Sequence, residues 1–143
     1  MMGFVPGDAV FVGKASIRKV PFFGYYFKNL HIAVDRGRVK SRAETMRRAG
    51  LALDRGSSIV LFPEGGIYTQ NPPQLVPFKN GAFRLAMEKQ IPIIPVTLSY
   101  NHVILADQKD LILKRIPAKM VLHQELNPID YPTEEALKQR CFR

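Results

Sequence analysis

The sequence predicts an α/β fold with a mixed, largely parallel sheet flanked by helices. Short apolar runs alternate with amphipathic segments along most of the 143 residues, which is typical of strands joined by crossover helices. The run Ser58-Ile59-Val60-Leu61-Phe62 is almost continuously apolar, as expected for a strand that is covered on both faces. The length fits one domain, so we expect residues 1–143 to form a single domain.

The first part of the chain contains three expected strands and two expected helices. Apolar runs predict strands over 9–12, 31–34 and 58–62. A first helix is expected to begin at or near Pro21 and to continue to Asn29. A second helix is expected to start at a capping box in which Ser41 caps the amide of Glu44, and to stop at Gly56.

The second part contains a short amphipathic helix over 80–90, strands over 93–99 and 119–123, and a terminal helix capped by Thr133. The carboxyl ends of parallel strands meet at one edge of a sheet, where ligands of α/β proteins bind. Two such ends carry polar groups that are candidates for chemistry, Asp35-Arg36 and Pro63-Glu64-Gly65. We therefore expect the functional site at this edge.

The charge is strongly basic and unevenly distributed. The net charge is +9, and residues 1–56 carry 11 basic against 4 acidic side chains, a surplus of 7. An anionic partner is therefore expected: nucleic acid, an anionic membrane or a phosphorylated substrate. The chain shows no glycine-aromatic RNA-binding signature and no recognition-helix pattern, so we do not expect nucleic acid. The single cysteine, Cys141, excludes a disulfide framework within the chain.

Aromatic residues over 22–27 are flanked by cations, the composition of a patch that lies at the level of lipid headgroups. The alternative is a helix that faces the core and has a solvated basic edge. The residues concerned are Phe22, Phe23, Tyr25, Tyr26 and Phe27, with Arg18, Lys19 and Lys28.

The most specific local motif is Phe62-Pro63-Glu64-Gly65, in which a strand ends in a proline, a carboxylate and a glycine. The glycine allows close backbone approach to a ligand, or a positive φ. Taken alone, the motif is equally typical of a turn with a solvated glutamate. Other motifs surround it in a fixed order: Val12-Gly13-Lys14-Ala15-Ser16, Val20-Pro21-Phe22-Phe23-Gly24, Ile32-Ala33-Val34-Asp35-Arg36, Pro77-Phe78-Lys79-Asn80-Gly81-Ala82-Phe83-Arg84 and Ile91-Pro92-Ile93-Ile94-Pro95-Val96.

In this order and spacing the chain resembles the 1-acylglycerol-3-phosphate (lysophosphatidate) acyltransferases of phospholipid synthesis, over roughly residues 9–140. The resemblance implies a glycerolipid O-acyltransferase that moves a fatty acyl group from an acyl thioester to a lysophospholipid such as 1-acylglycerol-3-phosphate. It implies acyl-CoA or an acyl-carrier protein as the donor, and an anionic membrane with which the chain associates peripherally at its cytoplasmic face. It implies no cofactor and no metal.

The resemblance also assigns roles to particular residues. Arg36 matches an arginine that looks like a ligand for the phosphate of the acceptor. Pro95 matches a block that shapes the acyl-donor side, and Lys14 and Lys79 fall at basic positions near the site. The block that helps to hold the glycerol phosphate corresponds to Phe62, Pro63, Glu64 and Gly65.

The chain departs from the family pattern at two blocks. Where the family commonly continues with Thr-Arg, this chain has Gly66-Ile67, so one cation that would hold phosphate is missing. Where a glycine and a phenylalanine are usual, this chain has Leu30 and Ala33. These departures leave open an acceptor other than lysophosphatidate.

A further block, His-x4-Asp, belongs upstream of the first matched strand. In the family its histidine is the general base and its aspartate orients the histidine. Because the chain starts too late to contain this block, we expect an N-terminally truncated member that is inactive alone. The alternative is a non-catalytic lipid- or membrane-binding module. Asn101-His102 with Asp107 repeats the pattern after the last block, where we expect only a loop.

Overall fold

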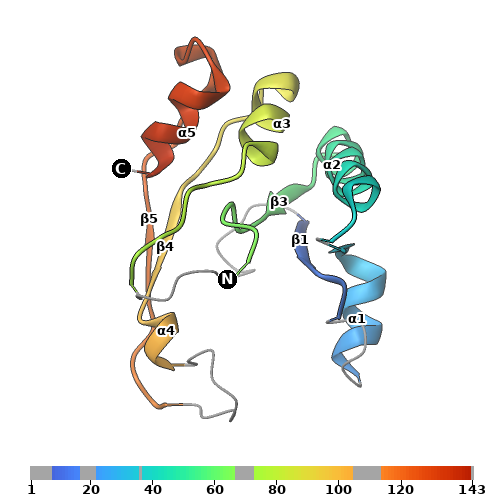
Figure 1. Cartoon of the computed structure of the whole chain (residues 1–143), viewed down its shortest axis with the longest axis vertical. Helices are drawn as coiled ribbons and strands as arrows, with labels where there is room; N and C mark the ends of the chain where they lie inside the picture. The colour runs from blue at the N-terminus through green and yellow to red at the C-terminus, as the bar shows by residue number, and fades with distance from the viewer. Residues whose placement is uncertain (1–7, 17–21, 36, 67–72, 105–113, 143) are drawn as a thin grey trace. The chain divides into compact units, whose positions relative to one another are not determined.

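The computed structural model describes residues 8–16, 22–35, 37–66, 73–104 and 114–142. It divides into two compact units, Met1–Pro63 and Glu64–Arg143. Each unit has its own strands and helices (Figure 1). The boundary falls inside the Phe62-Pro63-Glu64-Gly65 motif, between the proline and the glutamate.

The first unit contains a parallel sheet with the strand order β2-β1-β3. The central strand β1 (Ala9–Lys14) pairs through its second half with β2 (Ile32–Val34), and through its first half with β3 (Ser58–Val60). The parallel sheet confirms this part of the predicted α/β class. The strand expected over 58–62 ends two residues earlier, at Val60. The expectation that it is buried on both faces is also wrong. Its three residues are half-buried, and among the described residues β3 pairs with β1 alone, as an edge strand.

The two helices of this unit, α1 (Phe23–Leu30) and α2 (Val39–Asp54), connect the parallel strands. The prediction that Ser41 caps α2 is wrong, because the helix begins two residues earlier, at Val39. The Ser41 hydroxyl instead accepts a hydrogen bond of 3.0 Å from the backbone N–H of Asp35, which follows the end of β2. The end of α2 is as predicted, since Gly56 has a φ of 83° and its N–H donates to the carbonyl of Leu53.

His31 is a packing residue in the core of the first unit. Its side chain lies beside the rings of Phe11 and Phe27, at centroid distances of 5.2 and 5.1 Å, and the residue is 6% exposed. The Nδ1 atom accepts a hydrogen bond of 3.3 Å from the backbone N–H of Phe11. Burial lowers the pKa of His31, against an opposing hydrogen bond with the backbone of Leu30. The neutral imidazole is therefore the form that fits the core.

Acidification should weaken the first unit through this histidine. Its pKa is lowered by folding, so the unfolded chain takes up a proton first as the pH falls below about 6.5, the usual histidine value. The stabilising contribution is complete above that pH and is lost as the pH falls toward the lower folded pKa. We expect the free energy of urea unfolding to fall more between pH 7.5 and 5.5 in the wild-type chain than in His31→Gln. An equal fall in the two proteins would contradict the account.

The second unit combines an antiparallel strand pair with two packed helices. β4 (Val96–Ser99) pairs with β5 (Lys119–Leu122) in the register Val96↔Leu122, and a bridge between Ile93 and Leu126 extends the pairing. The expected strand over 93–99 is thus interrupted, because Pro95 has no N–H to donate to a ladder. The short helix α4 (Asn101–Ile104) follows β4.

The helices α3 (Gly81–Lys89) and α5 (Glu134–Phe142) lie side by side and contact each other (Figure 1). Their shared core holds Phe83, Ala86, Leu126 and the fully buried Leu137. The predicted cap of α5 is confirmed, since Thr133 Oγ1 accepts a hydrogen bond of 3.2 Å from the N–H of Ala136.

Candidate functional site

Three of the predicted site residues lie together at the start of the second unit: Glu64, Gly65 and Lys79. We call them the Gly65 cluster. A Cβ atom built on Gly65 would lie 2.8 Å from Nζ of Lys79 and 3.0 Å from its Cδ and Cε atoms. The lysine side chain therefore covers the backbone of Gly65 and ends at it.

The backbone of Gly65 has a φ of +75°, which confirms the positive φ that the motif suggested. Residues that carry a side chain rarely adopt this conformation. A side chain at position 65 would also have to displace Lys79, because the contact distances leave it no room. Two features therefore require a glycine at position 65: its positive φ and the close contact of its backbone with Lys79.

Glu64 has a structural task in this cluster. Its Oε2 atom accepts a hydrogen bond of 3.2 Å from the backbone N–H of Val76, which ties together the two ends of the segment over 64–76. The side chain is half-buried. The alternative interpretation of the motif, a turn with a solvated glutamate, is correct about the turn but wrong about the glutamate.

The remaining predicted residues of this motif, Phe62 and Pro63, belong to the first unit. Phe62 is 54% exposed beyond the end of β3. Their role in holding the acceptor stays a prediction.

Lys14 is the last residue of β1 and pairs in register with Val34, the last residue of β2. This places its exposed side chain at the carboxyl edge of the parallel sheet, next to the turn that follows β2. In this turn Asp35 Oδ1 accepts a hydrogen bond of 3.1 Å from the N–H of Gly37. Arg36 lies outside the described residues, and its role stays a prediction.

Pro95 and His102 both lie in or next to regular elements of the second unit. The carbonyl of Pro95 accepts a hydrogen bond of 2.9 Å from the N–H of His123, beside the β4–β5 pair. His102 is exposed in α4, so the expected loop is a short helix there, and Asp107 lies outside the described residues. The structure leaves the assignment of Pro95 to the donor side as a prediction.

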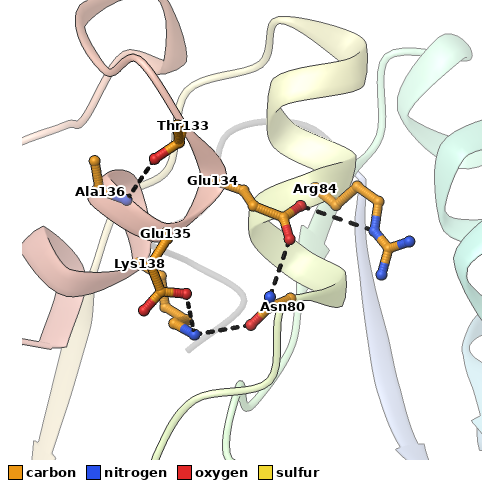
Figure 2. Close-up of polar contacts among 7 residues, drawn as sticks. All are labelled: Asn80, Arg84, Thr133, Glu134, Glu135, Ala136 and Lys138. Atoms are coloured by element: carbon orange, nitrogen blue, oxygen red, sulfur yellow. Dashed lines mark hydrogen bonds and ion pairs between the residues drawn. The ribbon is translucent and has the colours of Figure 1, made fainter.

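A polar network that the sequence did not reveal starts at Asn80, the residue that follows Lys79 in the chain (Figure 2). The side-chain amide of Asn80 donates from Nδ2 to Glu134 Oε1 over 2.9 Å, and its Oδ1 accepts from Lys138 Nζ over 2.8 Å. We call these three residues the Asn80 clamp. Arg84 also approaches Glu134, with 3.9 Å between Nε and Oε2. The only signal in the sequence was that positions 134 and 138 share one face of a helix.

Comparison with known proteins identifies the class. Residues 1–99 match the family model described as Acyltransferase, which is more than half of the chain. The chain therefore belongs to the acyltransferase family, as the motifs predicted.

Two similar relatives are 1-acyl-sn-glycerol-3-phosphate acyltransferases. The protein of Haemophilus influenzae is 36% identical over 124 residues, which are 85% of this chain and 48% of that protein. The protein of Escherichia coli is 35% identical over 129 residues, which are 88% and 49% of the two chains. The chain thus spans about half the length of these curated relatives.

The fold also matches a solved structure, that of the 1-acyl-sn-glycerophosphate acyltransferase PlsC from Thermotoga maritima. The TM-score is 0.68 at 20% identity, and the match covers 94% of this chain and 53% of that chain. The predicted fold class, α/β with a mixed sheet and flanking helices, is therefore confirmed.

Proposed function

We propose that this chain forms the acceptor-binding part of a glycerolipid O-acyltransferase. In the proposed reaction the hydroxyl of a lysophospholipid such as 1-acylglycerol-3-phosphate attacks the carbonyl of an acyl thioester. An ester bond forms and the thioester bond breaks; the hydroxyl proton passes to a general base, which then gives it to the leaving thiolate. The observation that carries the proposal is the Gly65 cluster, where the ammonium of Lys79 lies against the backbone of Gly65 and the neighbouring Glu64 is held by the N–H of Val76.

The cluster suits an anion such as the phosphate of the acceptor. Because Gly65 has no side chain, Lys79 can lie against its backbone, and a phosphate oxygen would bind at the ammonium there. The ammonium of Lys79 supplies a point charge with three donors, which forms charge-assisted hydrogen bonds. Arg36, by resemblance, adds a guanidinium with a planar pair of donors. Glu64 is tied to Val76 by a hydrogen bond to the backbone N–H of that residue.

On the donor side we propose acyl-CoA or an acyl-carrier protein, with Pro95 shaping the approach. A direct transfer is favoured over an acyl-enzyme at Cys141. That thiol is half-buried in the core of the second unit, and burial raises its pKa to about 11. The cysteine is therefore a protonated thiol near neutral pH and a poor nucleophile.

Removal of the cluster's cation tests the proposal. In Lys79→Ala we expect the affinity for lysophosphatidate to fall about ten- to a hundredfold, the worth of a hydrogen bond to a charged group. Lys89→Ala is the matched control. It removes the same charge at the other end of α3, from the last residue of that helix, and should bind like the wild type. Equal affinities for all three proteins would remove Lys79 from the site.

Membrane association is the second part of the proposal, and it is also what a non-catalytic binding module would do. Phe22 is 95% exposed and Tyr25 is 78% exposed at the start of α1. Phe27, which we expected in the same patch, is buried against His31 and does not belong to it. No helix among the described residues is long and apolar enough to cross a bilayer.

We propose that Phe22 and Tyr25 enter the headgroup region of an anionic leaflet, at the cytoplasmic face, while the basic first unit attracts it. The wild-type chain should float with phosphatidylserine vesicles at low salt and dissociate at high salt, because the attraction between charges is screened. The double variant Phe22→Ser/Tyr25→Ser should float less, whereas Tyr100→Ser, at an exposed tyrosine of the second unit, should not change. Equal flotation of both variants would contradict this surface.

A further inference from the structure

Lys79 lies between two residues that are both anchored to the helix α5. On one side, the ring of Phe78 lies 5.0 Å from that of Phe142, at the end of α5, and stacks near Phe83 of α3. On the other side, both polar atoms of the Asn80 side chain are bonded to α5, through Glu134 and Lys138 (Figure 2). The backbone at Lys79 is thereby held from both neighbours.

The helix that makes these contacts is itself fixed. Leu137, between the two charged residues of the clamp, is fully buried in the core with Phe83 and Leu126. Glu134 and Lys138 are one turn apart and project from the same face, toward the start of α3 (Figure 2). The side chain of Lys138 is only 19% exposed, so the clamp is partly shielded from water. Helix α5 lies beyond residues 1–99, which match the family model.

We propose that Asn80 is a positioning residue: with Glu134 and Lys138 it fixes the start of α3, and thereby holds the ammonium of Lys79 against the backbone of Gly65. What the ammonium binds, the phosphate of the acceptor, rests on the proposed function above. The clamp acts through Lys79, and Asn80 itself needs no contact with the ligand.

The chemistry of the clamp dictates an informative set of variants. Asn80 must offer its N–H to a carboxylate and its oxygen to an ammonium, so Asn80→Asp places two carboxylates together and breaks the bond with Glu134. Adding Glu134→Gln exchanges the amide and the carboxylate between the two positions. Every hydrogen bond can then form again, and the net charge equals that of the wild type.

A matched control separates the geometry of the clamp from charge alone. Glu88 is exposed near the far end of α3. The pair Asn80→Asp with Glu88→Gln therefore also keeps the wild-type net charge, but it leaves the clamp broken. The two double variants carry the same net charge and differ in whether the hydrogen bonds of the clamp can be rebuilt; the variant with Glu134→Gln also gives up the 3.9 Å approach of Arg84 to Glu134.

Two readouts are measured on the whole chain and its variants: the NMR resonance of the Gly65 amide without ligand, and the affinity for lysophosphatidate. We expect Asn80→Asp to shift the Gly65 resonance and to weaken binding about tenfold, as for one misplaced charged hydrogen bond. Adding Glu134→Gln should restore both readouts, and adding Glu88→Gln should restore neither.

The outcomes distinguish this inference from the proposed function. If both double variants recover, or if Asn80→Asp lowers the melting temperature and leaves the Gly65 resonance unchanged, the clamp does not position Lys79 and the inference is overturned. If the Gly65 resonance follows the expected pattern but the wild-type chain does not bind lysophosphatidate, the positioning inference holds and the acceptor assignment fails.

Discussion

Purified and supplied with a labelled acyl thioester and lysophosphatidate, the 143 residues alone should bind the acceptor but show no measurable acyl transfer. By resemblance they contain groups that hold the acceptor, but no general base in the family position. Loss of a general base costs about 10² to 10⁴ in rate, and loss of a base together with its orienting carboxylate can cost roughly 10⁶. Bound acceptor would therefore remain unchanged.

The His102 variant is the control for this prediction. Its histidine is exposed in α4 and repeats the family pattern in the wrong place along the chain, so His102→Ala should not change either binding or transfer. Robust turnover that disappears in His102→Ala would contradict the prediction and would make that histidine the base.

Arg36→Ala should weaken the affinity for lysophosphatidate about ten- to a hundredfold, because a charge-assisted bond to phosphate contributes about 1.5–3 kcal/mol. Arg36→Lys should recover only part of this loss, since a point charge replaces a planar fork of donors. Isothermal titration of the three proteins with the lipid measures both effects.

The control for Arg36 is Arg47→Ala. Arg47 carries the same charge but pairs with Glu44 through two hydrogen bonds of 2.7 and 2.8 Å on the outer face of α2. Its removal should leave the affinity unchanged. Binding by Arg36→Ala as tight as that of the wild type would take Arg36 out of the acceptor site.

The elements of the fold could be predicted from the sequence because they depend on local patterns. Apolar runs located the strands, and Thr133 and Gly56 marked helix ends through hydrogen bonds within a few residues. The predicted capping box at Ser41 is wrong because α2 begins at Val39, and the Ser41 hydroxyl instead accepts a hydrogen bond from the backbone N–H of Asp35. Phe27 was misplaced because its burial depends on His31 and the sheet.

In the candidate site, too, single residues could be predicted from local patterns, whereas contacts between separate parts of the chain could not. Glu64, Gly65 and Lys79 could each be singled out from motifs, but their contact joins positions 14 residues apart through the fold, 65 and 79. The Asn80 clamp joins positions 54 and 58 residues apart and depends on how α5 packs against α3. No local pattern encodes such a pairing, since propensity and periodicity describe single elements.

The central claim is that the chain recognises the phosphate of a lysophospholipid, and the most direct test exchanges only that group. The affinity of the wild-type chain is measured for 1-acylglycerol-3-phosphate and for the same 1-acylglycerol without phosphate. We predict binding at least about tenfold tighter for the phosphorylated lipid, with much of the difference lost in Lys79→Ala. Equal affinity for the two lipids would contradict the claim.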